Sequence, residues 1–255
     1  MTKNFKKRLG IYAMAGAGAL ILVGLSVAAA LSPYEHVDQR HCVVGAVPAK
    51  VLAVELDTSD PLVVVEPREV SFAIDQALNS LNKGDRIIAL DVGGKALPEI
   101  APIVDQCHPG DDDNIARNAF RRTILQPIAA HLRDVLGRPA AAESPLAESM
   151  VSLASDPSIH PRGSKLVILF VTDGMQNSAL ESAYRRGSKF PKPEGQPLKG
   201  VVIELVLIKN ERDIALQPRA IVRLTAWLQA AGAQVIAPEP GWLSLARTEH
   251  RGGKR

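Results

Sequence analysis

The segment VLAVELDTSDPL, residues 51–62, decides the fold prediction. Its first half is mostly apolar and runs into the turn-forming sequence Thr-Ser-Asp-Pro, which is typical of a strand buried on both faces of a parallel sheet. A second segment, KLVILFVT at residues 165–172, has the same form and is followed by Asp173. Parallel sheets bind ligands at the carboxyl ends of their strands, so Asp57, Ser59 and Asp173 are expected to face one crevice if these strands are neighbours. Two carboxylates and a hydroxyl offer only oxygen ligands, which suit Mg²⁺ or Mn²⁺.

Further strands and helices alternate along the chain, which predicts an α/β fold with a doubly wound, mostly parallel sheet and helices on both faces. Apolar runs predict strands at 86–92, 201–208 and 233–236, and a short edge strand within 100–107. Apolar residues at helical spacing predict helices at 67–83, 114–135, 144–155 and 218–231. Residues 175–178 are expected to lead into a further short helix that ends near Arg186. Asp111, Asp112 and Asp113 are expected to cap the second of these helices.

The N-terminus predicts a membrane anchor, because Lys3, Lys6, Lys7 and Arg8 precede an uncharged stretch at 9–31. As a helix this stretch is roughly 34 Å long, enough to cross a bilayer, and its basic flank would remain in the cytoplasm. The alternative is a cleaved signal peptide that ends near SVAAA at 26–30. The sequence therefore predicts a cytoplasmic segment 1–8, a transmembrane helix 9–31, a linker 32–50, an extracytoplasmic domain 51–240 and a basic, disordered tail 241–255.

Cys42 and Cys107 would lie in an oxidising compartment, where two cysteines are expected to form a disulfide. Such a bridge closes a loop of about 65 residues and would stabilise the fold by about 4 kcal/mol in the chain-entropy model. The alternative is a pair of unrelated buried thiols.

Several classes of function are set aside by composition and by missing motifs. A net charge of +3 with 4% aromatic residues provides neither a basic footprint nor stacking platforms for nucleic acid. The turn after the first strand lacks the glycines of a dinucleotide site, and the chain has no Walker A sequence and no nucleophile elbow. An aspartyl phosphatase would need a second aspartate where Ser59 stands.

The remaining pattern resembles the von Willebrand factor A family, whose metal-ion-dependent adhesion site uses D-x-S-x-S, a later threonine and an aspartate after the central strand. Asp57-Thr58-Ser59 matches the start of that motif, the sequence VTDG around Asp173 matches its end, and Ser144 in ESPLAES is the candidate for the middle hydroxyl. Pro61 stands where the family has its second serine, so Asp60 or water is the candidate substitute. The chain is also similar to uncharacterised bacterial membrane-anchored proteins with such a domain, which implies a single-pass protein of the bacterial inner membrane with a periplasmic domain.

The resemblance implies a non-enzymatic protein-binding domain with Mg²⁺ or Mn²⁺ held by Asp57, Ser59, Ser144 and Asp173, and an open coordination position that an acidic side chain of a partner fills. Two alternatives belong to other classes. One is a metal-assisted phosphoester hydrolase, for which His108 and Glu143 are the candidate general bases. The other is a metal-free structural component of an envelope assembly.

Overall fold

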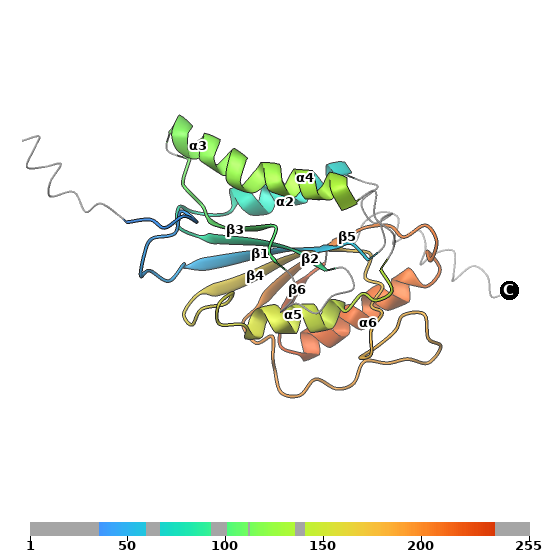
Figure 1. Ribbon diagram of the computed structural model, residues 1–255. Coiled ribbons are helices and arrows are strands. Elements are labelled where there is room, and N and C mark those ends of the chain that lie inside the picture. The colour runs from blue at the N-terminus through green and yellow to red at the C-terminus, as the bar shows by residue number, and fades with distance from the viewer. Residues whose placement is uncertain (1–35, 60–66, 93–100, 112, 136–140, 238–255) are drawn as a thin grey trace, which may run out of the picture. The chain divides into compact units, whose positions relative to one another are not determined.

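A six-stranded sheet in the order β3-β2-β1-β4-β5-β6 forms the centre of the fold (Figure 1). The computed structural model describes residues 36–59, 67–92, 101–111, 113–135 and 141–237, and those from Asp38 on belong to one unit. The strands are β1 Lys50–Asp57, β2 Arg86–Val92, β3 Val104–Cys107, β4 Lys165–Thr172, β5 Val202–Leu207 and β6 Gln234–Ile236. All of the described strand pairings are parallel except that of β2 with β3. The predicted mostly parallel sheet is therefore present, with an antiparallel edge strand.

Helices cover both faces of the sheet because successive residues of each strand point to opposite faces and both sets are apolar. Val51 and Ala53 of β1 belong to one cluster of buried side chains, and Leu52 and Val54 belong to the other. The first cluster is completed by α5 Leu146–Ser155 and α6 Gln217–Ala230. The second is completed by α2 Pro67–Asn79 and α4 Gln126–Val135. Figure 1 shows the two pairs of helices on opposite sides of the strands.

The helix predicted after the aspartates is present, but it changes type along its length. Asp113 caps α3, Asn114–Phe120, by accepting a hydrogen bond from Ala116 N at 2.7 Å. A π-helical turn, Arg121–Leu125, then leads into α4. Pro127, in the first turn of α4, has no N–H to donate to the helical hydrogen bonds. The wider π-helical turn before it accommodates the missing hydrogen bond.

The short helix predicted after residues 175–178 is not formed, and all of residues 175–186 are described. Their backbone instead makes single β-bridges, between Asn177 and Ser144 and between Asn177 and Ser182. The bridge to Ser144 connects segments that are distant in sequence, and local helical periodicity gives no information about it. The prediction was wrong for that reason.

A disulfide joins Cys42 to Cys107 and so ties the chain before β1 to the edge strand β3, which confirms the predicted pair. Polar contacts add to this connection. Cys107 N donates to Arg40 O at 2.7 Å, and the Asp105 carboxylate accepts from Arg40 at 3.1 Å and from Arg86 at 2.7 Å.

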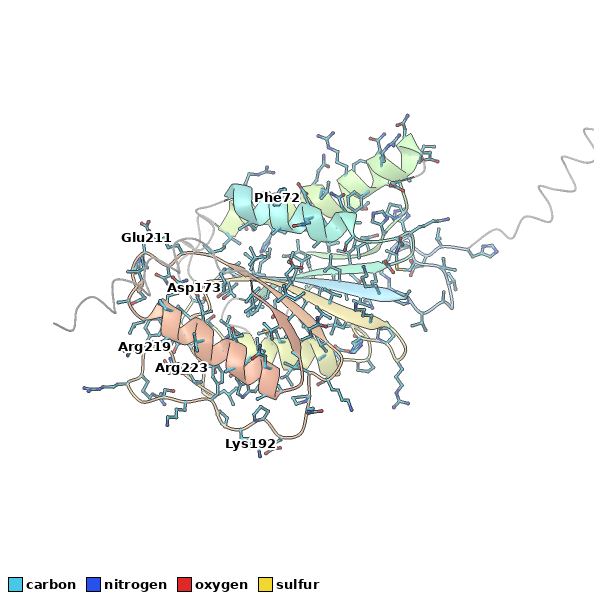
Figure 2. All side chains as sticks on the ribbon, turned by 180° about the vertical axis from the view of Figure 1, so that it is seen from behind. Phe72, Asp173, Lys192, Glu211, Arg219 and Arg223 are labelled. Atoms are coloured by element: carbon cyan, nitrogen blue, oxygen red, sulfur yellow. A yellow bond between two sulfur atoms is a disulfide. The ribbon has the colours of Figure 1, made fainter. Side chains whose placement is uncertain are left out.

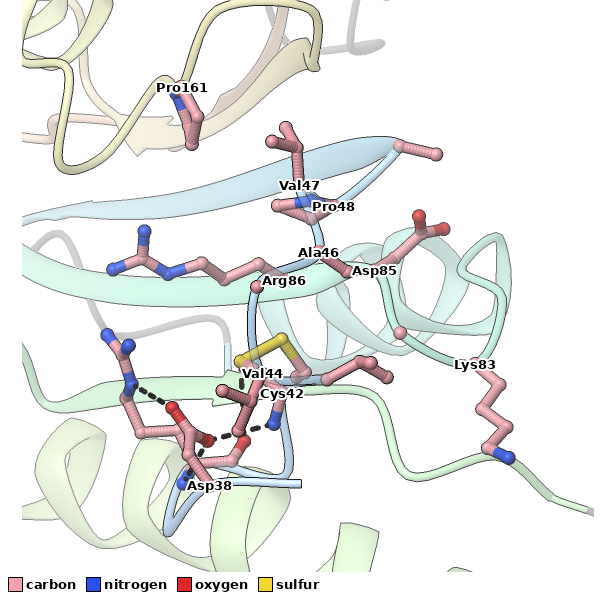
Figure 3. Close-up of a pocket in the computed structure, with 16 residues that line it drawn as sticks. Asp38, Cys42, Val44, Ala46, Val47, Pro48, Lys83, Asp85, Arg86 and Pro161 are labelled. Atoms are coloured by element: carbon pink, nitrogen blue, oxygen red, sulfur yellow. Dashed lines mark hydrogen bonds and ion pairs between the residues drawn. A yellow bond between two sulfur atoms is a disulfide. The ribbon is translucent and has the colours of Figure 1, made fainter. Parts of the chain in front are cut away.

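The strap formed by residues 38–49 borders a hollow of about 550 Å³ at the amino ends of the strands (Figure 3).

The predicted anchor 9–31 and the tail 241–255 lie outside the described residues. Among the helices that the structure does describe, none combines the length and the hydrophobicity of a membrane span.

Replacing both cysteines by alanine (Cys42→Ala with Cys107→Ala) should lower the free energy of unfolding by about 4 kcal/mol, because the unfolded chain regains the entropy of an open loop. Urea unfolding of the variant and of the native protein measures this difference. Under reducing conditions the difference should largely disappear, and a difference that persists there would mean that the alanines themselves disturb the packing.

Candidate functional site

The candidate site lies where the sheet order reverses, between β1 and β4. From β1 the chain order proceeds to β2 and β3 on one side and to β4, β5 and β6 on the other, and such a switch point is where open α/β sheets bind ligands. β1 and β4 are direct neighbours, and Leu56 pairs with Val171 at the end of their shared register. The next residues along, Asp57 and Thr172, therefore lie side by side at the carboxyl edge.

The Asp57 carboxylate is buried, with 1% of the residue exposed, and three side-chain hydroxyls donate hydrogen bonds to it. Its Oδ1 accepts from Ser59 Oγ at 2.6 Å and from Ser144 Oγ at 3.3 Å. Its Oδ2 accepts from Thr172 Oγ1 at 2.7 Å. The backbone N–H of Ser59 donates to Oδ1 as well, at 3.1 Å. We call these four residues the Asp57 cluster.

Ser144 reaches the cluster because it does not act as a helix cap. The N-cap of α5 is Pro145, without a side-chain hydrogen bond, so the Ser144 hydroxyl is available to Asp57. A pair of backbone hydrogen bonds with Asn177, at 2.7 and 2.9 Å, holds Ser144 in place. Residue 144 is thus positioned by the segment that follows Asp173 and by α5 together.

Thr172 is the member of the cluster that sequence reasoning missed. Its hydroxyl donates to Asp57 and accepts from Gly174 N at 2.8 Å, so it connects the ends of β1 and β4. Strand alternation was the signal that could have found it. Phe170 and Ile168 belong to the same core cluster as Val51 and Ala53, so Thr172 lies on the sheet face of Asp57.

Asp173 follows Thr172 directly, but its carboxylate has other partners. Oδ2 accepts from Asn210 Nδ2 at 2.6 Å and Oδ1 accepts from Met175 N at 2.8 Å. Its backbone oxygen accepts from Gln217 Nε2 at 2.9 Å, next to the start of α6 (Figure 2). The structure thus gathers Asp57, Ser59 and Ser144 of the predicted set around one carboxylate, and it binds the Asp173 carboxylate to the connection after β5. The candidate substitute Asp60 lies outside the described residues, as does Pro61.

A second polar network supports the same edge of the sheet. Thr58 Oγ1 donates a short hydrogen bond to Asp91 Oδ1 at the end of β2, and His131 Nε2 of α4 lies 2.9 Å from Asp91 Oδ2. Thr58 stands between Asp57 and Ser59, so this network fixes the turn that carries both. Neither Asp91 nor His131 follows a motif that the sequence analysis could have used.

Glu55 is a fully buried carboxyl two residues before Asp57. Among the described residues neither of its oxygens has a well-formed hydrogen bond, since the nearby Ser149 hydroxyl donates to Leu146 O at 2.7 Å. Burial raises the pKa of Glu55 to about 8, opposed by Ser149 and assisted by the charge of Asp57. The side chain is therefore neutral at neutral pH.

The donors of the Asp57 cluster fit a hard divalent cation such as Mg²⁺ or Mn²⁺, because all of them are oxygens and one is a carboxylate. Burial raises the pKa of Asp57 above its ordinary value, although the hydrogen bonds from Ser59 and Thr172 oppose the shift. A bound cation would supply the positive charge that favours the ionised carboxylate. Among the described residues no three His, Cys, Asp or Glu side chains gather in a metal-binding group, so hydroxyls would have to supply much of the coordination.

Comparisons with known proteins give the following findings. No family model and no curated protein matches the chain. Solved structures that are similar to it include the proximal thread matrix protein 1 of the mussel byssus (6% identity, TM-score 0.37, covering 79% of this chain and 47% of that one). They also include a von Willebrand factor type A structure from Catenulispora acidiphila (12% identity, TM-score 0.36, covering 81% and 42%) and the pilus adhesin SpaC of Lactobacillus rhamnosus GG in an open conformation (10% identity, TM-score 0.41, covering 82% and 30%). The chain spans less than half the length of each. Because all three TM-scores lie below 0.5, the likeness decides nothing about the function of this chain.

The two candidate general bases of the hydrolase alternative lie in different places. His108 follows β3 at the amino edge of the sheet, where its backbone N–H donates to Asp85 O at 2.8 Å. The length of β2 separates that edge from the Asp57 cluster, roughly 20 Å at the rise of an extended strand. Glu143 is exposed and directly precedes Ser144. His108 therefore cannot act on a substrate at the cluster.

Glu55→Gln should remove part of the pH dependence of stability. The pKa of Glu55 is raised to about 8 in the folded protein, so between its ordinary value of about 4.5 and about 8 this carboxyl ionises in the unfolded chain but stays protonated in the folded one. The free energy of unfolding therefore falls as pH rises through this range, by at most about 1.4 kcal/mol per pH unit. In urea unfolding at about pH 5 and about pH 7.5, with a chelator present, the variant should lose less stability than the native protein.

Glu204→Gln on β5 is the matched control, because Glu204 is only half-buried on another strand of the same sheet. Equal slopes for the native protein and Glu55→Gln would show that Glu55 is already ionised in the folded state.

Proposed function

We propose that the chain is a membrane-anchored, extracytoplasmic protein-binding domain of the von Willebrand A type. In this proposal Mg²⁺ or Mn²⁺ is held by Asp57, Ser59 and Ser144, with Asp173 acting directly or through water, and Thr172 adds a further hydroxyl. An acidic side chain of the partner completes the coordination of the ion.

The observation that carries the proposal is the buried Asp57 carboxylate, which three hydroxyls surround at the switch point of the sheet. A carboxylate is costly to bury without a positive charge, and a divalent cation would supply that charge. The hydroxyls come from the turn after β1, the start of α5 and the end of β4, so one ion would connect three elements. When bound, such an ion acts as a Lewis acid toward an oxygen ligand of the partner.

The chain's own residues set what the site can do. The backbone bridge between Ser144 and Asn177 and the hydrogen bond from Thr58 to Asp91 hold the oxygen donors in position before any ligand arrives. Preorganised donors reduce the entropy that binding costs. Of the two candidate bases of the hydrolase alternative, His108 lies at the other edge of the sheet, which favours binding over hydrolysis.

Asp57→Asn should weaken Mn²⁺ binding by more than about tenfold, and Thr172→Val by about tenfold, because the first removes the charged ligand and the second removes a hydroxyl beside it. Electron paramagnetic resonance of free Mn²⁺ in a titration of the full chain measures the affinity. Asp75→Asn on the exposed face of α2 is the matched control and should leave the affinity unchanged.

Thermal melting of each variant in chelator separates loss of metal from loss of fold. If native protein and Asp57→Asn bind Mn²⁺ equally, the Asp57 cluster is not a metal site. If purified native protein holds no ion at millimolar Mn²⁺ or Mg²⁺, the metal-free alternative replaces this proposal. Cell fractionation and N-terminal sequencing of the mature chain test the anchor.

A further inference from the structure

One face of the molecule, beside the Asp57 cluster, is strongly basic. Residues 181–200 and α6 together hold seven Lys and Arg residues and two acidic residues, whereas the whole chain holds 30 and 27. Of the two acidic residues, Glu181 is buried and lies 2.9 Å from Arg223 in an ion pair, which leaves Glu194. The exposed basic residues, which we call the basic face, are Arg185, Arg186, Lys189, Lys192, Lys199 and Arg219. Within the described part of the chain none of these six side chains takes part in an ion pair or a hydrogen bond.

The loop that carries most of these charges is fixed against α6. Trp227 Nε1 donates to Pro191 O at 2.9 Å, and the rings of Phe190 and Trp227 lie 5.4 Å apart. Arg223 donates to Ser188 O at 2.7 Å, and Leu198 is fully buried. Figure 2 shows Lys192 on this loop, with Arg219 and Arg223 on the helix beside it. The loop that carries these charges is therefore held in place against α6, so ligand binding does not cost the entropy of ordering it.

One hydrogen-bonded path connects the basic face to the Asp57 cluster, and another connects it to Asp173, the residue after Thr172. The first runs from Ser144 through Asn177 to Ser182, whose N–H donates to Ser188 Oγ at 3.2 Å. The second runs from Asp173 O to Gln217 at the start of α6, two residues before Arg219. The end of the basic face that holds Arg185, Arg186 and Arg219 therefore lies toward the Asp57 cluster. Lys199 lies at the other end of α6, where Leu198 N donates to Ala231 O at 2.9 Å.

We propose that the basic face binds an acidic segment of the same partner whose carboxylate completes the site. The inference rests on the proposed function and names the chemistry of the partner: a protein with several Asp or Glu residues next to the one that reaches the metal. Complementary charge of this kind speeds encounter and selects among partners that all offer a single carboxylate. Exposed charges are screened by salt, so the contribution falls with ionic strength.

A decaglutamate peptide with a fluorescent label serves as the probe, and a glycine-serine peptide of the same length serves as its control. The full chain is placed in phosphatidylcholine nanodiscs with Mg²⁺, and fluorescence anisotropy measures the affinity. Arg185→Glu, Arg186→Glu and Arg219→Glu in one chain should weaken decaglutamate binding by about tenfold or more. The matched control, Arg117→Glu, Arg121→Glu and Arg122→Glu on the other side of the sheet, makes the same change in net charge and should have an effect below about twofold.

A second set, Lys189→Glu with Lys192→Glu and Lys199→Glu, tests the same face if the first set does not fold. Equal weakening by the test set and the control set would overturn the inference, because net charge alone would then explain binding. Empty phosphatidylglycerol nanodiscs that bind the native chain, together with no binding of decaglutamate, would overturn it in favour of a membrane surface.

The Mn²⁺ titration separates this inference from the proposed function. If Mn²⁺ does not bind but the test set still weakens decaglutamate binding, the metal role fails and the acidic partner stands. If Mn²⁺ binds to the Asp57 cluster and the test set has no effect on decaglutamate, the metal role stands and the basic face is not a docking surface.

Discussion

The parallel register of β1 and β4 is the constraint on which the rest of the structure depends. It sets Asp57 beside Thr172 and places both at the switch point of the sheet. A shift of one residue in either strand would turn one of the two side chains to the opposite face, because strand side chains alternate. The apolar residues of both strands resist such a shift, since they would leave their own core clusters. The burial of two hydrophobic faces thus also fixes the geometry of a polar site.

Two carboxyl groups of β1, those of Glu55 and Asp57, are buried almost completely, which is unfavourable for their ionised forms. The two side chains differ in how this desolvation is compensated. Glu55 has no strong partner, and burial keeps it protonated at neutral pH. Asp57 receives four hydrogen bonds and lies at the carboxyl edge of the sheet. One strand therefore holds a carboxyl group without a strong partner inside the core and a hydrogen-bonded carboxyl group at its end.

The two edges of the sheet have separate tasks. At the amino edge, the disulfide and the ion pairs of Asp105 fasten the chain that enters β1. At the carboxyl edge, side chains from the turn after β1, the start of α5 and the end of β4 form the Asp57 cluster. The fastened edge and the proposed binding site are thereby placed roughly one strand length apart, so loops at the carboxyl edge can differ without loosening the fold.

The sequence by itself determined the elements whose signals are local. The apolar runs gave β1 and β4, the start of α2 was predicted at Pro67, and the count of two cysteines in an oxidising setting led to the correct bridge. The tertiary structure alone decided the contacts that join distant segments. Ser144 and Thr172 meet Asp57 across 87 and 115 residues, residues 175–186 form bridges in place of a helix, and Asp173 turns to Asn210. Periodicity reports how a segment buries its own side chains, whereas strand register and the packing of α5 and α6 decide which distant side chains meet.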